Sequence, residues 1–113
     1  MTIVRDTVTL DELRQMAAGM FGDMVKAVVD IERTLIALDA ELHSDLEALL
    51  LEDGSSQKNL WGINLYPELA GEQFIEFDSM INMRPSQNNR SRGVEDGAIR
   101  ARVIQIVTKA VHR

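Results

Sequence analysis

The polar segment from 84 to 96 holds the densest group of side chains that could bind a ligand. Guanidinium groups offer paired hydrogen-bond donors to phosphate or carboxylate, and free amides at a helix start add partial positive charge. No glycine-rich phosphate motif is present. An ordered surface loop, with arginines paired to sheet carboxylates such as Glu76 and Asp78, is the stronger interpretation. The anion-binding hypothesis is that this segment holds a phosphate or carboxylate group, and its residues are Arg84, Ser86, Asn88, Asn89, Arg90 and Arg92.

Acidic side chains and a histidine occupy alternate positions between 41 and 47. On a strand, Glu41, His43 and Asp45 would project from the same face, together with Glu47. An imidazole and carboxylates can hold a divalent ion or move a proton, so these residues are the candidate metal ligands of an alternative, enzymatic function. One histidine is weak evidence for a metal site, and a solvated strand face is the favoured interpretation.

Two further groups of side chains have a chemical and a structural interpretation. Glu76 and Asp78 could do acid and base work, but such pairs are common on strands, and we expect them on the outer face of the sheet. Trp61 and Tyr66 could stack on a base, but we expect both to pack in the core or at its edge.

The chain has 113 residues, a net charge of -6 and no cysteine. Its length predicts one domain over residues 1–113. No apolar run is long enough for a membrane span, and the lack of thiols agrees with a cytoplasmic protein that has no thiolate metal site. No cofactor is indicated.

Basic residues concentrate toward the C-terminus: residues 84–113 hold seven basic and two acidic side chains, whereas residues 1–83 hold five and sixteen. This split is typical of an anion or nucleic-acid surface, or of a basic segment folded over its own acidic half. The second interpretation is favoured, because an acidic chain repels polyanions. Nucleic acid is therefore not the favoured partner, and assembly into a homo-oligomer stays open.

Local signals define the two ends of the domain. Thr9 and Glu12 form the pattern of a capping box, and the apolar residues that follow recur at helical spacing as far as Met20, with Gly19 and Gly22 marking the end of the helix. Asp96 can cap a second helix that runs to Ala110. Between them, strands are predicted at 61–65 and 75–83, with a turn at 53–56. The stretch 25–51 fits both strands and one long helix.

The run LWGINLYP at 60–67, followed by FIEFDSMINMRPSQNNRSRGVED at 74–96, resembles an uncharacterised prokaryotic family described only as a domain of unknown function. The resemblance extends to VKAVVDIE at 25–32 and ELHSD at 41–45, and it brings no known activity. Relatives in that family carry Gly-Gly where this chain has Asp39-Ala40. The resemblance thus implies a two-residue hairpin turn there and strands on both sides, although Ala40 departs from the pattern.

These patterns together predict an α+β fold, with an antiparallel sheet of four or five strands and an N-terminal and a C-terminal helix packed on it. The leading functional hypothesis is a binding or interaction module that recognises a phosphate-containing or carboxylate ligand through the segment 84–92. The alternative is a small metal-dependent or hydrolytic enzyme that uses His43 and nearby carboxylates.

Overall fold

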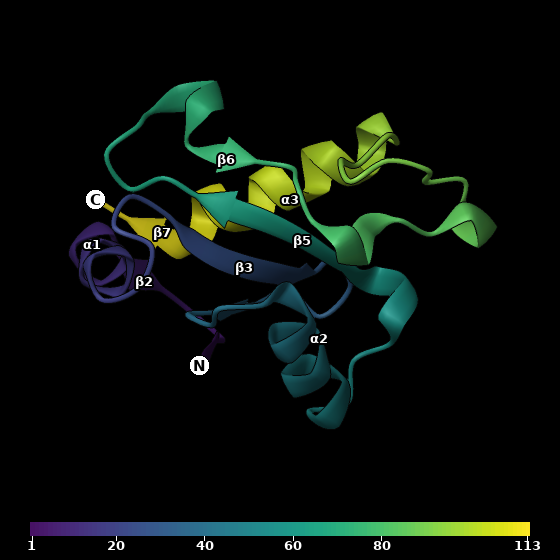
Figure 1. Cartoon of the computed structure of the whole chain (residues 1–113), viewed down its shortest axis with the longest axis horizontal. Coiled ribbons are helices and arrows are strands. Elements are labelled where there is room, and N and C mark those ends of the chain that lie inside the picture. The colour runs from purple at the N-terminus through teal and green to yellow at the C-terminus, as the bar shows by residue number, and fades with distance from the viewer.

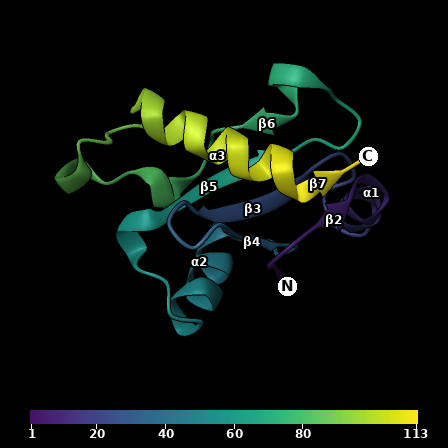
Figure 2. The same ribbon diagram turned by 180° about the vertical axis from the view of Figure 1, so that it is seen from behind.

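A five-stranded antiparallel sheet forms the centre of the molecule, with strand order β1-β4-β3-β5-β6 (Figure 1). The computed structural model describes all residues, 1–113. Seen from behind, α3 crosses one face of the sheet, and α2 lies on the other (Figure 2). The predicted α+β fold with its two terminal helices is therefore confirmed. The strands of the sheet are β1 Thr2–Val4, β3 Val25–Asp30, β4 Leu35–Leu38, β5 Leu60–Leu65 and β6 Ile75–Glu76.

Helix α1, Leu10–Ala18, begins with the predicted capping box. Thr9 Oγ1 accepts from the Glu12 N–H at 3.1 Å, and the Glu12 carboxylate accepts from the Thr9 N–H at 3.1 Å. Both otherwise unpaired amides of the first turn are thus satisfied by neighbours in sequence. The helix ends at Gly19, the first of the two glycines expected to mark its end.

Helix α3, Gly97–Ala110, is capped by Asp96, whose Oδ1 accepts from the N–H groups of Ala98 and Ile99. Beyond it, β7, Val111–His112, pairs in parallel with β2, Val8–Thr9. This two-residue ladder holds the end of the chain against the start of α1, and so brings the N-terminal segment beside α3.

Strands β3 and β4 form a hairpin, which confirms strands over one continuous helix for the first half of 25–51. The turn lies at residues 31–34, where Asp30 Oδ1 accepts from the N–H groups of Glu32 and Arg33. The hairpin turn expected at Asp39-Ala40 is wrong. Asp39 does adopt a positive φ of 74°, but it leads the chain out of β4 toward a helix.

The predicted strand through 41–47 is also wrong, because the chain forms helix α2 at His43–Glu52. Its buried residues His43, Leu46 and Leu50 recur at helical spacing and cover the sheet. Glu41, His43 and Asp45 therefore do not share the face of a strand. Glu41 precedes the helix, and Asp45 is exposed on it.

The predicted strand β5 is confirmed, but the strand predicted at 75–83 is confirmed only for β6 and is wrong beyond it. The chain instead forms 3-10 turns, η3 at Met80–Asn82 and η4 at Pro85–Gln87. Two further 3-10 turns flank β5 and β6, η1 at Gln57–Asn59 and η2 at Gly71–Gln73. Where β6 no longer pairs with β5, the side chain of Asn82 satisfies the backbone N–H and carbonyl of Gly62.

The core has one apolar cluster on each face of the sheet. The larger joins α1 and α3 to the side chains of Val29, Trp61 and Ile63, and the smaller packs α2 on Val28 and Leu60. No helix of the chain combines the length and apolar composition that a membrane crossing requires.

Candidate functional site

The loop that leads into α3 is built around the buried side chain of Asn89. Its Nδ2 donates to the carbonyls of Asn82 at 2.6 Å and Gly93 at 2.8 Å, and its Oδ1 accepts from the Glu95 N–H at 2.8 Å. The Glu95 carboxylate in turn accepts from the N–H groups of Arg90 and Ser91. Asn89 thus holds the loop in shape, and its buried amide donors are committed within the loop.

The Arg84 guanidinium is also committed within the fold. It lies 4.2 Å from the centre of the Trp61 ring and donates to the carbonyls of Gln57 and Leu60. Burial lowers the pKa of Arg84 below its ordinary value. A guanidinium stacked on an indole and bound to backbone carbonyls is a structural anchor between the loop and the end of β5.

The remaining residues of the predicted loop site do not converge. Arg92 Nε pairs with Asp78 Oδ1 at 2.5 Å, as the interpretation of an ordered loop predicted. Ser86 and Arg90 are exposed, and Asn88 adopts a left-handed conformation with φ 61° at the end of η4. None of the six side chains of the anion-binding hypothesis lines the pocket described below.

His43 lies at the first turn of α2, with Nε2 2.8 Å from the Ile63 carbonyl oxygen. Burial lowers the pKa of His43, which favours a neutral ring that donates from Nε2. No three His, Asp or Glu side chains lie close enough together to hold a metal ion, so Glu41 and Asp45 do not complete a site with this ring.

The structure instead gives His43 other polar neighbours, on the face of the sheet that α2 covers. Lys26 of β3 is paired in register with Asn64 of β5, and Asn64 with Glu76 of β6. Cross-strand partners project from the same face, so these three side chains form a row across three strands, which we call the polar row. Tyr66 joins it through a hydrogen bond of 2.9 Å from its hydroxyl to Glu76 Oε1.

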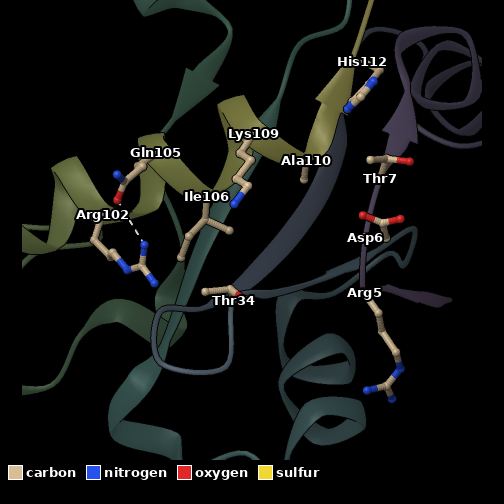
Figure 3. A pocket seen from close by; sticks show the side chains of 10 residues that line it. All are labelled: Arg5, Asp6, Thr7, Thr34, Arg102, Gln105, Ile106, Lys109, Ala110 and His112. Atoms are coloured by element: carbon tan, nitrogen blue, oxygen red, sulfur yellow. Dashed lines mark hydrogen bonds between the residues drawn. The ribbon is translucent and has the colours of Figure 1, made fainter.

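A pocket of about 590 Å³ lies on the opposite face, between α3 and the N-terminal segment; we call it the α3 pocket. In Figure 3, Arg102, Ile106 and Lys109 project from successive turns of α3, and Asp6 and Thr7 lie on the facing segment. Its ten lining residues are Arg5, Asp6, Thr7, Thr34, Arg102, Gln105, Ile106, Lys109, Ala110 and His112.

The charge of the α3 pocket is predominantly basic. Among its lining residues, Asp6 is the only acid. Arg102 donates to the Ile31 carbonyl at 3.2 Å and to Gln105 Oε1 at 3.0 Å, and neither Arg102 nor Lys109 forms a salt bridge. The Arg5 guanidinium points away from α3 and pairs with Asp53 at 2.6 Å. Two cationic side chains therefore face this pocket without a carboxylate partner.

Sequence reasoning missed the α3 pocket, although one signal was present. Arg102 and Lys109 are seven residues apart, which places them on the same side of a helix two turns apart. The facing wall, however, arises from the pairing of Val8 with Val111, residues at opposite ends of the chain. No local pattern predicts that contact.

Comparison with known proteins gives a family and no activity. No curated protein and no solved structure matches the chain. A family model described as "Protein of unknown function (DUF5674)" matches residues 2–110, which is nearly the whole sequence. The resemblance suggested by the segments at 60–67 and 74–96 is therefore confirmed, and the chain belongs to this family.

Proposed function

We propose that the protein is a non-catalytic binding domain that recognises a small anionic ligand in the α3 pocket. The observation that carries this proposal is the presence of Arg102 and Lys109 on one side of the pocket, neither of them in a salt bridge with a carboxylate. The general class of ligand is the one inferred from the sequence, a phosphate-containing or carboxylate group. The proposed location differs from the one expected from the sequence: the ligand would bind along α3 and not at the loop 84–92.

The Arg102 side chain supports this assignment because it is held before any ligand arrives. Its Nε donates to the Ile31 carbonyl and its Nη1 to Gln105, so the orientation of the guanidinium plane is fixed. A cation ordered in advance loses less conformational entropy when it binds an anion. Lys109 then adds a second positive charge from a flexible side chain.

The size and net charge of the molecule favour a small ligand over a polyanion. A volume of about 590 Å³ lies within the range of small-molecule sites, roughly 300–1,000 Å³. The chain carries a net charge of -6, which repels a nucleic-acid backbone at long range. The proposed partner is therefore a phosphate or carboxylate compound of metabolite size. The protein, which has no cysteine, is proposed to be cytoplasmic.

The test is a titration of the whole chain with inorganic phosphate and with adenosine monophosphate, followed by amide NMR shifts. We expect shifts at residues 5–7 and 102–112, and binding about tenfold weaker for Lys109→Gln, since one charged hydrogen bond is lost. Arg90→Gln is the matched control, because Arg90 is an exposed cation outside the pocket. It should bind as tightly as the original chain.

Two results would contradict the proposal. One is the absence of shifts around the α3 pocket with either anion. The other is a loss of binding in Arg90→Gln but not in Lys109→Gln, which would return the site to the loop before α3.

A further inference from the structure

The two walls of the α3 pocket carry opposite charges. Arg102 and Lys109 project from α3, whereas Asp6 lies on the segment that faces the helix (Figure 3). Asp6 is exposed and forms no salt bridge, and its neighbour Arg5 points away from α3 and pairs with Asp53. A ligand that carries only negative charge is therefore attracted by one wall of the pocket and repelled by the other.

The backbone around Asp6 is anchored on both sides. Val4, two residues before it, pairs with Ile36 in the five-stranded sheet. Val8, two residues after it, pairs with Val111 in the ladder of β2 and β7. The carboxylate is thus carried by a short segment that is held at both ends, so its position opposite α3 is set before a ligand binds. A group ordered in advance loses less conformational entropy on binding.

Apolar surface lies between the two charged walls of the pocket. Ile106 and Ala110 are the apolar residues of the lining, and both are largely buried on α3. In Figure 3 they lie between Arg102 and the segment that carries Asp6. A ligand that spans the pocket therefore passes over a surface that favours methylene groups over further polar groups.

We infer that the ligand of the α3 pocket is zwitterionic, with an aliphatic spacer that joins a phosphate or carboxylate to a primary ammonium group. The anionic end lies against Arg102 and Lys109, and the ammonium donates to the Asp6 carboxylate. This inference rests on the proposed function, because it adds a second end to the anion proposed to bind along α3. A zwitterion also carries less net negative charge than a simple anion, so the protein, with its net charge of -6, repels it less.

The experiment compares aminoethyl phosphate with ethyl phosphate in NMR titrations of the whole chain at pH 8. At this pH both phosphates are doubly ionised, since their second pKa is about 6, and the ammonium group keeps its proton. We expect both compounds to shift the amide signals of residues 5–7 and 102–112. Aminoethyl phosphate should bind about fivefold tighter than ethyl phosphate, which is the gain expected from one exposed ion pair.

Asp6→Asn should remove this preference, because it takes away the charge and keeps the shape of the side chain. It should weaken the binding of aminoethyl phosphate about fivefold and leave ethyl phosphate bound at least as tightly. Asp23→Asn is the matched control, since Asp23 is exposed, forms no salt bridge and lies outside the pocket. Asp6→Lys is a second variant, and it should reverse the preference because it adds a cation to the pocket.

Three results would overturn the inference while the anion site remains. The first is equal binding of aminoethyl phosphate and ethyl phosphate by the original chain. The second is binding of hydroxyethyl phosphate, which keeps a hydrogen-bond donor without the charge, as tightly as aminoethyl phosphate. The third is a preference that persists in Asp6→Asn. In each case ethyl phosphate still shifts the signals of α3. If none of these phosphates shifts them, the proposed function itself fails, and this inference fails with it.

Discussion

Asn82 and Gly62 are joined by two reciprocal hydrogen bonds in the interior of the molecule. The Gly62 N–H donates to Asn82 Oδ1 at 2.8 Å, and Asn82 Nδ2 donates to the Gly62 carbonyl at 2.9 Å. Asn82 is fully buried, and its Nδ2 also donates to the Arg92 carbonyl. Because β6 ends at Glu76, this side chain replaces a neighbouring strand along the part of the β5 edge that β6 does not pair.

Asn82→Ala should therefore lower the free energy of unfolding by about 3 kcal/mol, since it leaves both backbone groups of Gly62 buried without partners. Urea unfolding followed by circular dichroism measures the change. Gln73→Ala, at an exposed position in η2, is the control and should fall within about 0.5 kcal/mol of the original chain. An equally small loss for Asn82→Ala would show that water satisfies Gly62 as well as the side chain does.

Gly62→Ala tests the close approach at the same place. A Cβ at Gly62 would lie 2.6 Å from both Cβ and Oγ of Ser79, which is itself buried and cannot swing away. We expect a loss of about 1–3 kcal/mol in the same urea experiment. Gly97→Ala is the matched substitution, because nothing lies within 4 Å of a Cβ at the first residue of α3. It should raise stability by about 0.5 kcal/mol, and a loss in both variants would argue against a local clash.

Features fixed by neighbours in sequence were predictable. The capping box of Thr9 and Glu12 and the Asp96 cap involve residues within three positions of one another. The hydrogen bonds of both caps can therefore be predicted from the sequence alone. Strand β5 was predictable because Trp61 and Ile63 alternate with Gly62 and Asn64. In each case a local interaction decides the structure.

Helix α2 was not predictable, because its periodicity suits both structures. Leu46 and Leu50 share a face in a helix and also in a strand. What decides between them is packing against Val28 and Leu60, which lie on other elements. Asp39 was difficult for another reason: a positive φ at a residue other than glycine leaves no reliable mark in the sequence.

The contacts that commit the residues of the predicted loop site were not predictable from the sequence. Polar and basic residues were identified correctly in the segment before α3, but the sequence cannot reveal that Arg84 stacks on Trp61 or that Asn89 is enclosed by carbonyls. Both contacts join residues that are separated by long or irregular segments of the chain. The same is true of the polar row, whose register joins Lys26 to Asn64 across 38 positions.

Arg84→Lys should destabilise the fold although it conserves charge. A lysine cannot donate to Gln57 and Leu60 as a planar fork while it stacks on the indole, so we expect a loss of about 1–3 kcal/mol. Trp61 is the only tryptophan, and its fluorescence should change with the loss of the stacked cation. Arg90→Lys, at an exposed position, should change neither quantity. An unaltered emission spectrum in Arg84→Lys would exclude the stacked arrangement.

The buried ring of His43 makes the stability of the protein depend on pH. Burial lowers the pKa of His43 in the folded chain below the ordinary value of 6.5. As the pH falls through 6.5, the unfolded chain takes up this proton first, so the free energy of unfolding falls until the folded pKa is passed. The slope from one group is at most about 1.4 kcal/mol per pH unit.

His43→Gln isolates this effect, because a glutamine amide can still donate to the Ile63 carbonyl but does not titrate. We expect the difference in unfolding free energy between the original chain and the variant to be constant above about pH 7.5 and to shift against the original chain between about pH 6.5 and pH 5. Urea unfolding at a series of pH values gives both curves, and His112 and every carboxylate remain in both proteins. If the difference stayed constant down to pH 5, protonation of the folded chain would cost no more than protonation of the unfolded one. The buried, neutral His43 that caps the Ile63 carbonyl would then be the wrong description of this ring.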